Sequence, residues 1–129
     1  MSAPTEVPDL VAQTLDLSRR RGFITSTRSE TGRLLASLAA SRKGTLAELG
    51  TGCGVGSAWL SSGAPKGTQI VTAELDPDLA KDVQEIFADA DNVEVTSGDW
   101  TALEKYAPFA MLFVDAREGM ETIGGRADP

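Results

Sequence analysis

Residues 47–56 read Ala-Glu-Leu-Gly-Thr-Gly-Cys-Gly-Val-Gly and are the most informative part of the sequence. Its four glycines alternate directly after an apolar, strand-like run. We name residues 50–56 the glycine turn. Because glycine has no Cβ atom, such a turn can adopt positive φ values and bring bare backbone against a ligand. The stretch predicts a strand, a nucleotide-type binding turn and then a helix.

The spacing of the glycine turn differs from the dinucleotide-binding pattern Gly-x-Gly-x-x-Gly. A frame that begins at Gly52 has Ser57 in the third glycine place, and a frame that begins at Gly50 has Val55 there. This difference disfavours a ligand with a pyrophosphate.

Helical and strand-like patterns alternate along the rest of the chain. Helices are expected over 8–20, from 29 or 31 to 43, over 55–62 and over 77–88, and strands over 45–49, 69–74, 93–96 and 109–115. With right-handed crossovers, this alternation predicts an α/β fold, a Rossmann-like parallel sheet with flanking helices and strand order 3-2-1-4. Residues 1–22 are expected to form an N-terminal helical cap, and residues 23–129 the ligand-binding domain.

Acidic residues follow the predicted strands at the points where they end. Glu74 ends the second strand, Asp99 follows the third, and Asp115 ends the fourth. In an open parallel sheet the carboxyl ends of the strands meet at one edge, and ligands bind there beside the switch in strand order. We therefore expect these carboxylates to lie near the glycine turn.

The stretch Glu-x-Gly-x-Gly-x-Gly resembles motif I of the class I S-adenosylmethionine-dependent methyltransferases. Residues 71–76 look like the family's second strand, 98–100 like its adenine-binding segment, and 113–116 like the end of its fourth strand. Together with residues 29–35, this order is most similar to the small-molecule O-methyltransferase branch that includes catechol and caffeoyl-coenzyme A methyltransferases. The resemblance extends from about residue 23 to 116.

This resemblance implies the roles of several residues. Glu48 would accept from the amino group of S-adenosylmethionine, and Glu74 from both ribose hydroxyls. Asp99 would reach the exocyclic amine of the adenine, with Trp100 beside the ring. The expected cofactor-binding set is Glu48, Gly50, Thr51, Gly52, Gly54, Gly56, Glu74, Leu75, Asp99, Trp100 and Asp115.

Asp115 has a second implied role. In the metal-dependent branch the matching aspartate is a magnesium ligand that helps to orient and activate the substrate hydroxyl, so Asp115 is the catalytic and metal-binding candidate. The further metal ligands of the family lie in the fifth-strand region, which this sequence does not contain. One carboxylate makes an incomplete magnesium site.

The length of 129 residues is short for this family, whose seven-stranded sheet needs roughly 200. We expect a domain truncated after its fourth strand. That strand would then be an edge, and exposed edges recruit partners. The expected partners are a small-molecule methyl acceptor and either a second copy of the chain or another chain that completes the sheet.

Charge and composition exclude several classes of function. Residues 1–43 carry net charge +3 and residues 44–129 carry −10, so nucleic acid is not expected as a partner. No membrane partner is expected either, since no apolar run reaches spanning length. The chain has one cysteine and no histidine, which fits a reducing, cytoplasmic location. Cys53 is expected to face the cofactor as a small residue.

Three functional hypotheses remain open. The first is an S-adenosylmethionine-dependent methyltransferase that acts on an oxygen of a small molecule. The second is a non-catalytic module that binds S-adenosylmethionine or another chain. The third is an NAD-dependent oxidoreductase, which the glycine spacing disfavours.

Overall fold

The computed structural model describes residues 7–23 and 28–114 of the chain. Its strands form one parallel sheet in the order β3-β2-β1-β4, which confirms the predicted fold class and strand order. The strands are β1 (Thr45–Leu49), β2 (Ile70–Glu74), β3 (Val93–Ser97) and β4 (Phe109–Val114).

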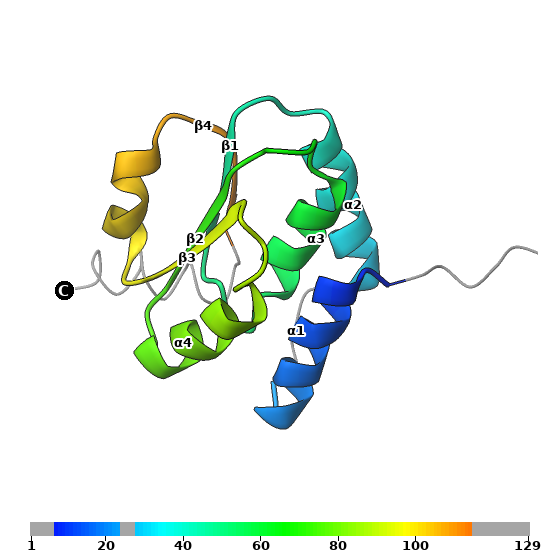
Figure 1. The fold of residues 1–129 in the computed structure, drawn as a ribbon, viewed down its shortest axis with the longest axis vertical. Helices are drawn as coiled ribbons and strands as arrows, with labels where there is room; N and C mark the ends of the chain where they lie inside the picture. The colour runs from blue at the N-terminus through cyan, green and yellow to red at the C-terminus, as the bar shows by residue number, and fades with distance from the viewer. Residues whose placement is uncertain (1–6, 24–27, 115–129) are drawn as a thin grey trace, which may run out of the picture.

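Helices cover both faces of the sheet (Figure 1). On one side lie α1 (Asp9–Arg20), α2 (Ser29–Ala40), α3 (Val55–Gly63) and α4 (Pro77–Ile86). On the other side lies the 3-10 helix η1 (Trp100–Tyr106). The sequence did not predict η1, because this short segment buries only Leu103 and shows no helical stripe.

Alternate residues of the strands point to two apolar cores. Leu46 and Ile70 belong to the larger core on the side of α1 to α4. Ala47 and Val71 belong to the smaller core, which Leu103 of η1 completes. Every residue of β2 is buried, as expected for a parallel strand that is covered on both faces.

Helix α1 is anchored to α3 and α4 rather than lying apart from the sheet domain. Val11 and Leu17 are buried in the larger core. At the end of α1, the guanidinium of Arg21 contacts the carboxylate of Asp82 on α4 at 2.6 Å. The segment expected as an N-terminal cap therefore shares its core with the sheet.

Strand β4 forms one edge of the sheet, and β3 forms the other. Strand β4 pairs with β1, and within the described residues no other strand pairs with it. All six of its residues keep some exposure, and Leu112 is 48% exposed.

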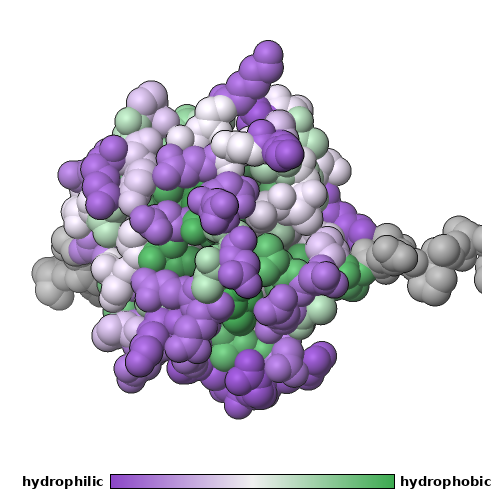
Figure 2. All heavy atoms as spheres, viewed as in Figure 1, coloured by the Kyte–Doolittle hydropathy of each residue, from purple (hydrophilic) through white to green (hydrophobic). Residues whose placement is uncertain are grey.

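Polar side chains cover much of the face drawn in Figure 2, with apolar surface between them. Among the described residues, no helix is both long and apolar enough to cross a membrane.

Candidate functional site

The glycine turn leaves β1 and is fixed by backbone hydrogen bonds to the end of β2. The amides of Gly50 and Thr51 both donate to the carbonyl of Ala73 at 3.1 Å. Gly50 and Gly52 have φ values of +81° and +55°, which strongly favour glycine. The turn is thus held at the end of the sheet that is formed by the carboxyl ends of the strands, where ligands bind in folds of this kind.

The glycines of the turn differ in what surrounds them. A Cβ atom added at Gly52 would meet nothing within 4 Å, so space is open beside this residue. At Gly54 an added Cβ would lie 2.9 Å from Cγ1 of Val83, and at Gly56 it would overlap the carboxylate of Glu48. Gly52 leaves space for a ligand. At Gly54 and Gly56 the space that a side chain would take is occupied by Val83 and Glu48.

Glu74 connects the turn to the start of α4. Its Oε1 accepts from the amide of Gly52 at 2.8 Å, and its Oε2 accepts from the amide of Asp76 at 2.9 Å. Burial raises the pKa of this carboxyl, since the residue is only 2% exposed, while hydrogen bonds from the backbone amides of Asp76, Gly52 and Leu75 oppose the rise. Each oxygen keeps acceptor capacity for a further donor such as a sugar hydroxyl.

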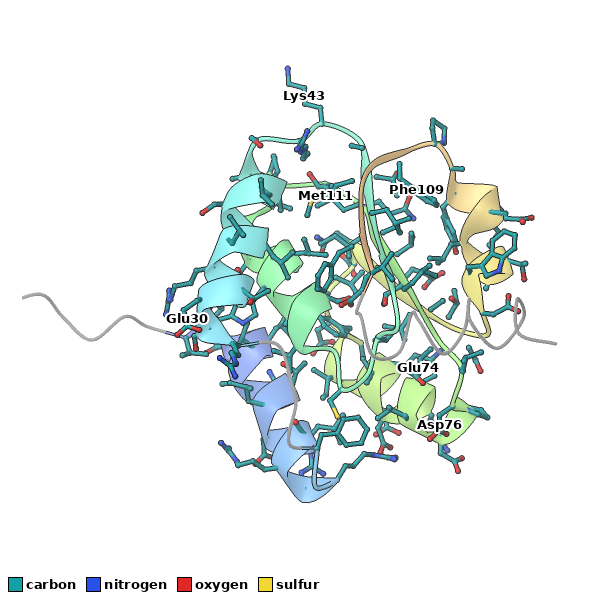
Figure 3. All side chains as sticks on the ribbon, turned by 180° about the vertical axis from the view of Figure 1, so that it is seen from behind. Glu30, Lys43, Glu74, Asp76, Phe109 and Met111 are labelled. Atoms are coloured by element: carbon teal, nitrogen blue, oxygen red, sulfur yellow. The ribbon has the colours of Figure 1, made fainter. Side chains whose placement is uncertain are left out.

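Figure 3 places Glu74 and Asp76 at one end of the sheet and Lys43 and Phe109 at the other. Asp76 caps α4, because its Oδ1 accepts from the amides of Asp78 and Leu79 at 3.0 and 3.4 Å. The candidate site therefore lies at the end of the sheet where α4 begins.

Glu48 lies behind the turn, beneath the first residues of α3. Its Oε1 accepts from the hydroxyls of Ser57 at 2.5 Å and Thr72 at 3.4 Å. The side chain is 1% exposed. Its predicted contact with the amino group of a ligand stays a prediction, and its Oε1 already accepts from two protein hydroxyls.

The segment after β3 lies beside Glu74, as expected. The amide of Gly98 donates to the carbonyl of Glu74 at 2.8 Å, so Asp99, the next residue, lies beside the end of β2. Asp99 caps η1, because its Oδ1 accepts from the amide and hydroxyl of Thr101 at 2.9 and 2.5 Å. Trp100 and Leu75 are 40% and 47% exposed. Two large apolar side chains thus remain open to solvent near this edge.

Asp115, the catalytic and metal-binding candidate, lies outside the described residues. Within residues 7–23 and 28–114, no group of three or more acidic or cysteine side chains is placed to hold a metal ion. Its role stays a prediction.

Cys53 does not face the open side of the turn, contrary to the sequence-based expectation. It is 4% exposed and belongs to the larger core with Val55 and Phe87. The side chain therefore packs with residues at the start of α3 and the end of α4.

Two buried hydroxyl groups of the site, those of Thr72 and Ser57, were not predicted from the sequence. Both side chains are fully buried. The contact of Thr72 follows from the register of the sheet, because Thr72 is the partner of Glu48 in the pairing of β1 with β2. A polar residue opposite a buried carboxylate is a candidate hydrogen-bond donor.

Neither the protein-family models nor the curated protein sequences give a match to this chain. Solved structures do match it, and the three described here are 22–24% identical to it. The cofactor-bound Rv0187 from MTB has a TM-score of 0.78 and 24% identity, over 97% of this chain and 61% of that one.

Two further matches are O-methyltransferases. TomG from Streptomyces achromogenes, involved in tomaymycin synthesis and solved with SAM, has a TM-score of 0.73 and 23% identity, over 96% of this chain and 71% of that one. The enzyme from Bacillus cereus, solved with SAH, has a TM-score of 0.71 and 22% identity, over 86% and 56%. This chain thus matches between 56% and 71% of the length of the three proteins. Its architecture is the Rossmann-like fold of the methyltransferases.

Proposed function

We propose that this chain binds S-adenosylmethionine at the glycine turn and acts in methylating an oxygen of a small molecule. The observation that carries the proposal is the open space beside Gly52, bordered by the carboxylate of Glu74 that its amide contacts at 2.8 Å. The matched structures with bound SAM or SAH support it, because they share this fold.

The chemistry of the edge fits an adenosyl ligand. A buried carboxylate with spare acceptor capacity suits a sugar diol, and Glu74 offers one at the end of β2. The exposed side chains of Leu75 and Trp100 offer apolar and aromatic surface for a purine ring. Asp99 would accept from the adenine amine. The acidic charge of the domain also favours a cationic cofactor.

When bound, S-adenosylmethionine supplies an electrophilic methyl group on a sulfonium centre. The protein's contribution is to hold the acceptor oxygen in line with that methyl group, and such positioning can supply a large part of the rate. In this chain the turn and Glu74 would fix the adenosyl end. Asp115 would help to bind a magnesium ion that orients the acceptor hydroxyl.

A non-catalytic module is the second candidate function. The observation that favours it is the exposure of strand β4, where Leu112 is 48% exposed and could pack against another chain. Such a module would bind S-adenosylmethionine without turnover, even when magnesium is present.

Strand β4 is the expected place for a protein partner. Its six residues keep partial exposure, and the backbone on its open side has no paired strand within the described residues. A second copy or another chain would pair there and cover Leu112, which is 48% exposed. We also infer a cytoplasmic location, from the single cysteine and the lack of a disulfide partner.

Isothermal titration calorimetry tests the binding proposal directly. Separate titrations with S-adenosylmethionine, S-adenosylhomocysteine and NAD should show saturable one-to-one binding of the first two and none of the third. Absence of heat and of thermal stabilisation with both adenosyl ligands would refute the proposal. Binding of NAD alone would favour the oxidoreductase hypothesis.

A methyl-transfer assay then separates enzyme from module. Transfer of labelled methyl from S-adenosylmethionine to a panel of catechols and other hydroxylated aromatics, with and without magnesium, supports the enzyme. Tight binding with no transfer to any acceptor favours the module.

A further inference from the structure

Three successive residues of β2 hold three successive residues of the glycine turn. The carbonyl of Ala73 accepts from the amides of Gly50 and Thr51, and the carboxylate of Glu74 accepts from the amide of Gly52. The third connection joins side chains, because the hydroxyl oxygens of Thr51 and Thr72 lie 2.6 Å apart. The position of the turn is therefore set by the end of β2.

The hydroxyl of Thr72 extends this connection to the start of α3. Thr72 donates to Oε1 of Glu48 at 3.4 Å, and the same oxygen accepts from Ser57 at 2.5 Å. Since a hydroxyl has only one proton, Thr72 can donate to Glu48 only if Thr51 donates to Thr72. The side chains then form one directed series from Thr51 through Thr72 to Glu48, which Ser57 joins from the other side.

All four side chains in this series are buried, with exposed fractions between 0% and 3%. The series links residue 51, near the start of the turn, to residue 57 in the first turn of α3. Between these two residues, three positions are glycine and impose little conformational restriction of their own. Buried hydrogen bonds are a means of fixing a single conformation in such a flexible segment.

We propose that Thr72 is a positioning residue, which fixes the glycine turn in the conformation that leaves Gly52 open to the ligand. The inference rests on the proposed function, since it names what orders that binding site. Thr72 is fully buried and reaches the ligand only through Thr51 and the turn. Its hydroxyl restricts the turn before the ligand arrives, and such preorganisation raises affinity.

The test replaces the hydroxyl while keeping the shape of the side chain. Thr72→Val leaves the Thr51 hydroxyl without its partner, and Thr72→Ser keeps the hydrogen bonds. Thr96→Val is the matched control, because the hydroxyl of Thr96 donates to the backbone carbonyl of Thr72 at 3.0 Å from β3 and does not contact the turn. Calorimetry with S-adenosylhomocysteine and amide chemical shifts of the ligand-free proteins are the two readouts.

We expect Thr72→Val to weaken binding by about five- to tenfold, the size of one buried hydrogen bond. The amide resonances of Gly50 and Gly52 should shift or broaden. Thr72→Ser should bind with an affinity within about twofold of that of the unsubstituted protein. Thr96→Val should also bind within about twofold, although it loses stability. Equal losses in Thr72→Val and Thr96→Val would show a merely structural role and overturn the proposal, as would unchanged affinity in Thr72→Val.

The amide shifts separate this inference from the proposed function. If the unsubstituted protein binds neither adenosyl ligand, the proposed function fails, yet the ligand-free spectra still report whether Thr72 orders the turn. Unchanged Gly50 and Gly52 resonances in a folded Thr72→Val protein would overturn the positioning role by themselves.

Discussion

At Gly52 an added Cβ atom would meet nothing within 4 Å, whereas at Gly54, two residues later, it would lie 2.9 Å from Cγ1 of Val83 and 3.1 Å from Cε2 of Phe87. We call Gly52 the open half of the turn and residues 54–56 the packed half. Both belong to one run of alternating glycines in the sequence. One sequence motif can therefore combine a ligand surface with a packing requirement, and the two should respond differently to substitution.

The largest expected effect is in the packed half. Gly54→Ala places a methyl group against Val83 and Phe87 at a φ of +90°, so it adds backbone strain to overpacking. We expect a loss of about 2–5 kcal/mol in the free energy of unfolding. Urea unfolding followed by circular dichroism measures it. A loss below that of Gly52→Ala would contradict the division of the turn into two halves.

The next effect concerns the carboxylate that contacts the open half. Glu74→Gln removes the negative charge that would bind a sugar diol, and we expect affinity for S-adenosylhomocysteine to fall by about 10- to 100-fold, as for a hydrogen bond to a charged group. Calorimetry at neutral pH is the measurement. Glu85→Gln, an exposed change on α4, is the control and should bind normally.

Glu74→Gln should also change how stability depends on pH. Burial raises the pKa of Glu74 above its ordinary value of 4.5, so the folded protein keeps this proton after the unfolded chain has lost it. Its contribution to stability is therefore present below about 4.5 and is lost as pH rises through the folded pKa. The unfolding free energy of the unsubstituted protein minus that of Glu74→Gln should therefore fall as pH rises from about 4.5 through the folded pKa. A constant difference across that window would show that the pKa is not raised.

Gly52→Ala tests the open half of the turn. The alanine should cost about 1 kcal/mol of stability at its φ of +55°, because the left-handed region strains a residue with a Cβ atom. Its methyl group enters the open space, so we expect at least about tenfold weaker ligand binding. Gly67→Ala is the matched control, with φ +86° and open space far from the site. It should lose similar stability and keep full affinity. Equal affinity in both variants would place the ligand elsewhere.

The smallest effect is expected just outside the turn. Asp76→Ala removes the side-chain cap of α4, which accepts from the amides of Asp78 and Leu79. We expect a loss of about 1 kcal/mol in stability, the usual value for such a cap. Affinity should change by less than about threefold, because the amide of Asp76 still donates to Glu74. A thermal melt with and without ligand measures both. A loss of affinity as large as in Gly52→Ala would show that the side chain of Asp76 belongs to the binding site.

Much of the fold was predictable because its signals are local. The apolar runs at 45–49 and 70–74 indicate buried strands. The Asp76-Pro77 pair indicates a helix that begins at Pro77, which is the first residue of α4. Helix η1 was missed because Leu103 alone is buried within it. A short 3-10 segment gives the sequence no period to detect.

The candidate site was predictable in its location but not in its internal contacts. Glu74 and Asp99 could be assigned to one edge, because strand ends meet there. That Gly54 faces Val83, or that Cys53 joins the core, depends on how the helices pack and leaves no local pattern. The same is true of the hydrogen bond from Thr72 to Glu48, which requires the register of two strands that are separate in sequence.

Titration of ¹⁵N-labelled protein with S-adenosylhomocysteine, followed by amide chemical shifts, tests whether the glycine turn binds the cofactor. We expect saturable shifts concentrated at Gly50, Gly52, Leu75 and Asp99, with little change at Lys43 and Gly67 at the opposite end of the sheet. Shifts that cluster at that opposite end, or no saturable shift at the glycine turn, would show that the glycine turn is not the binding site.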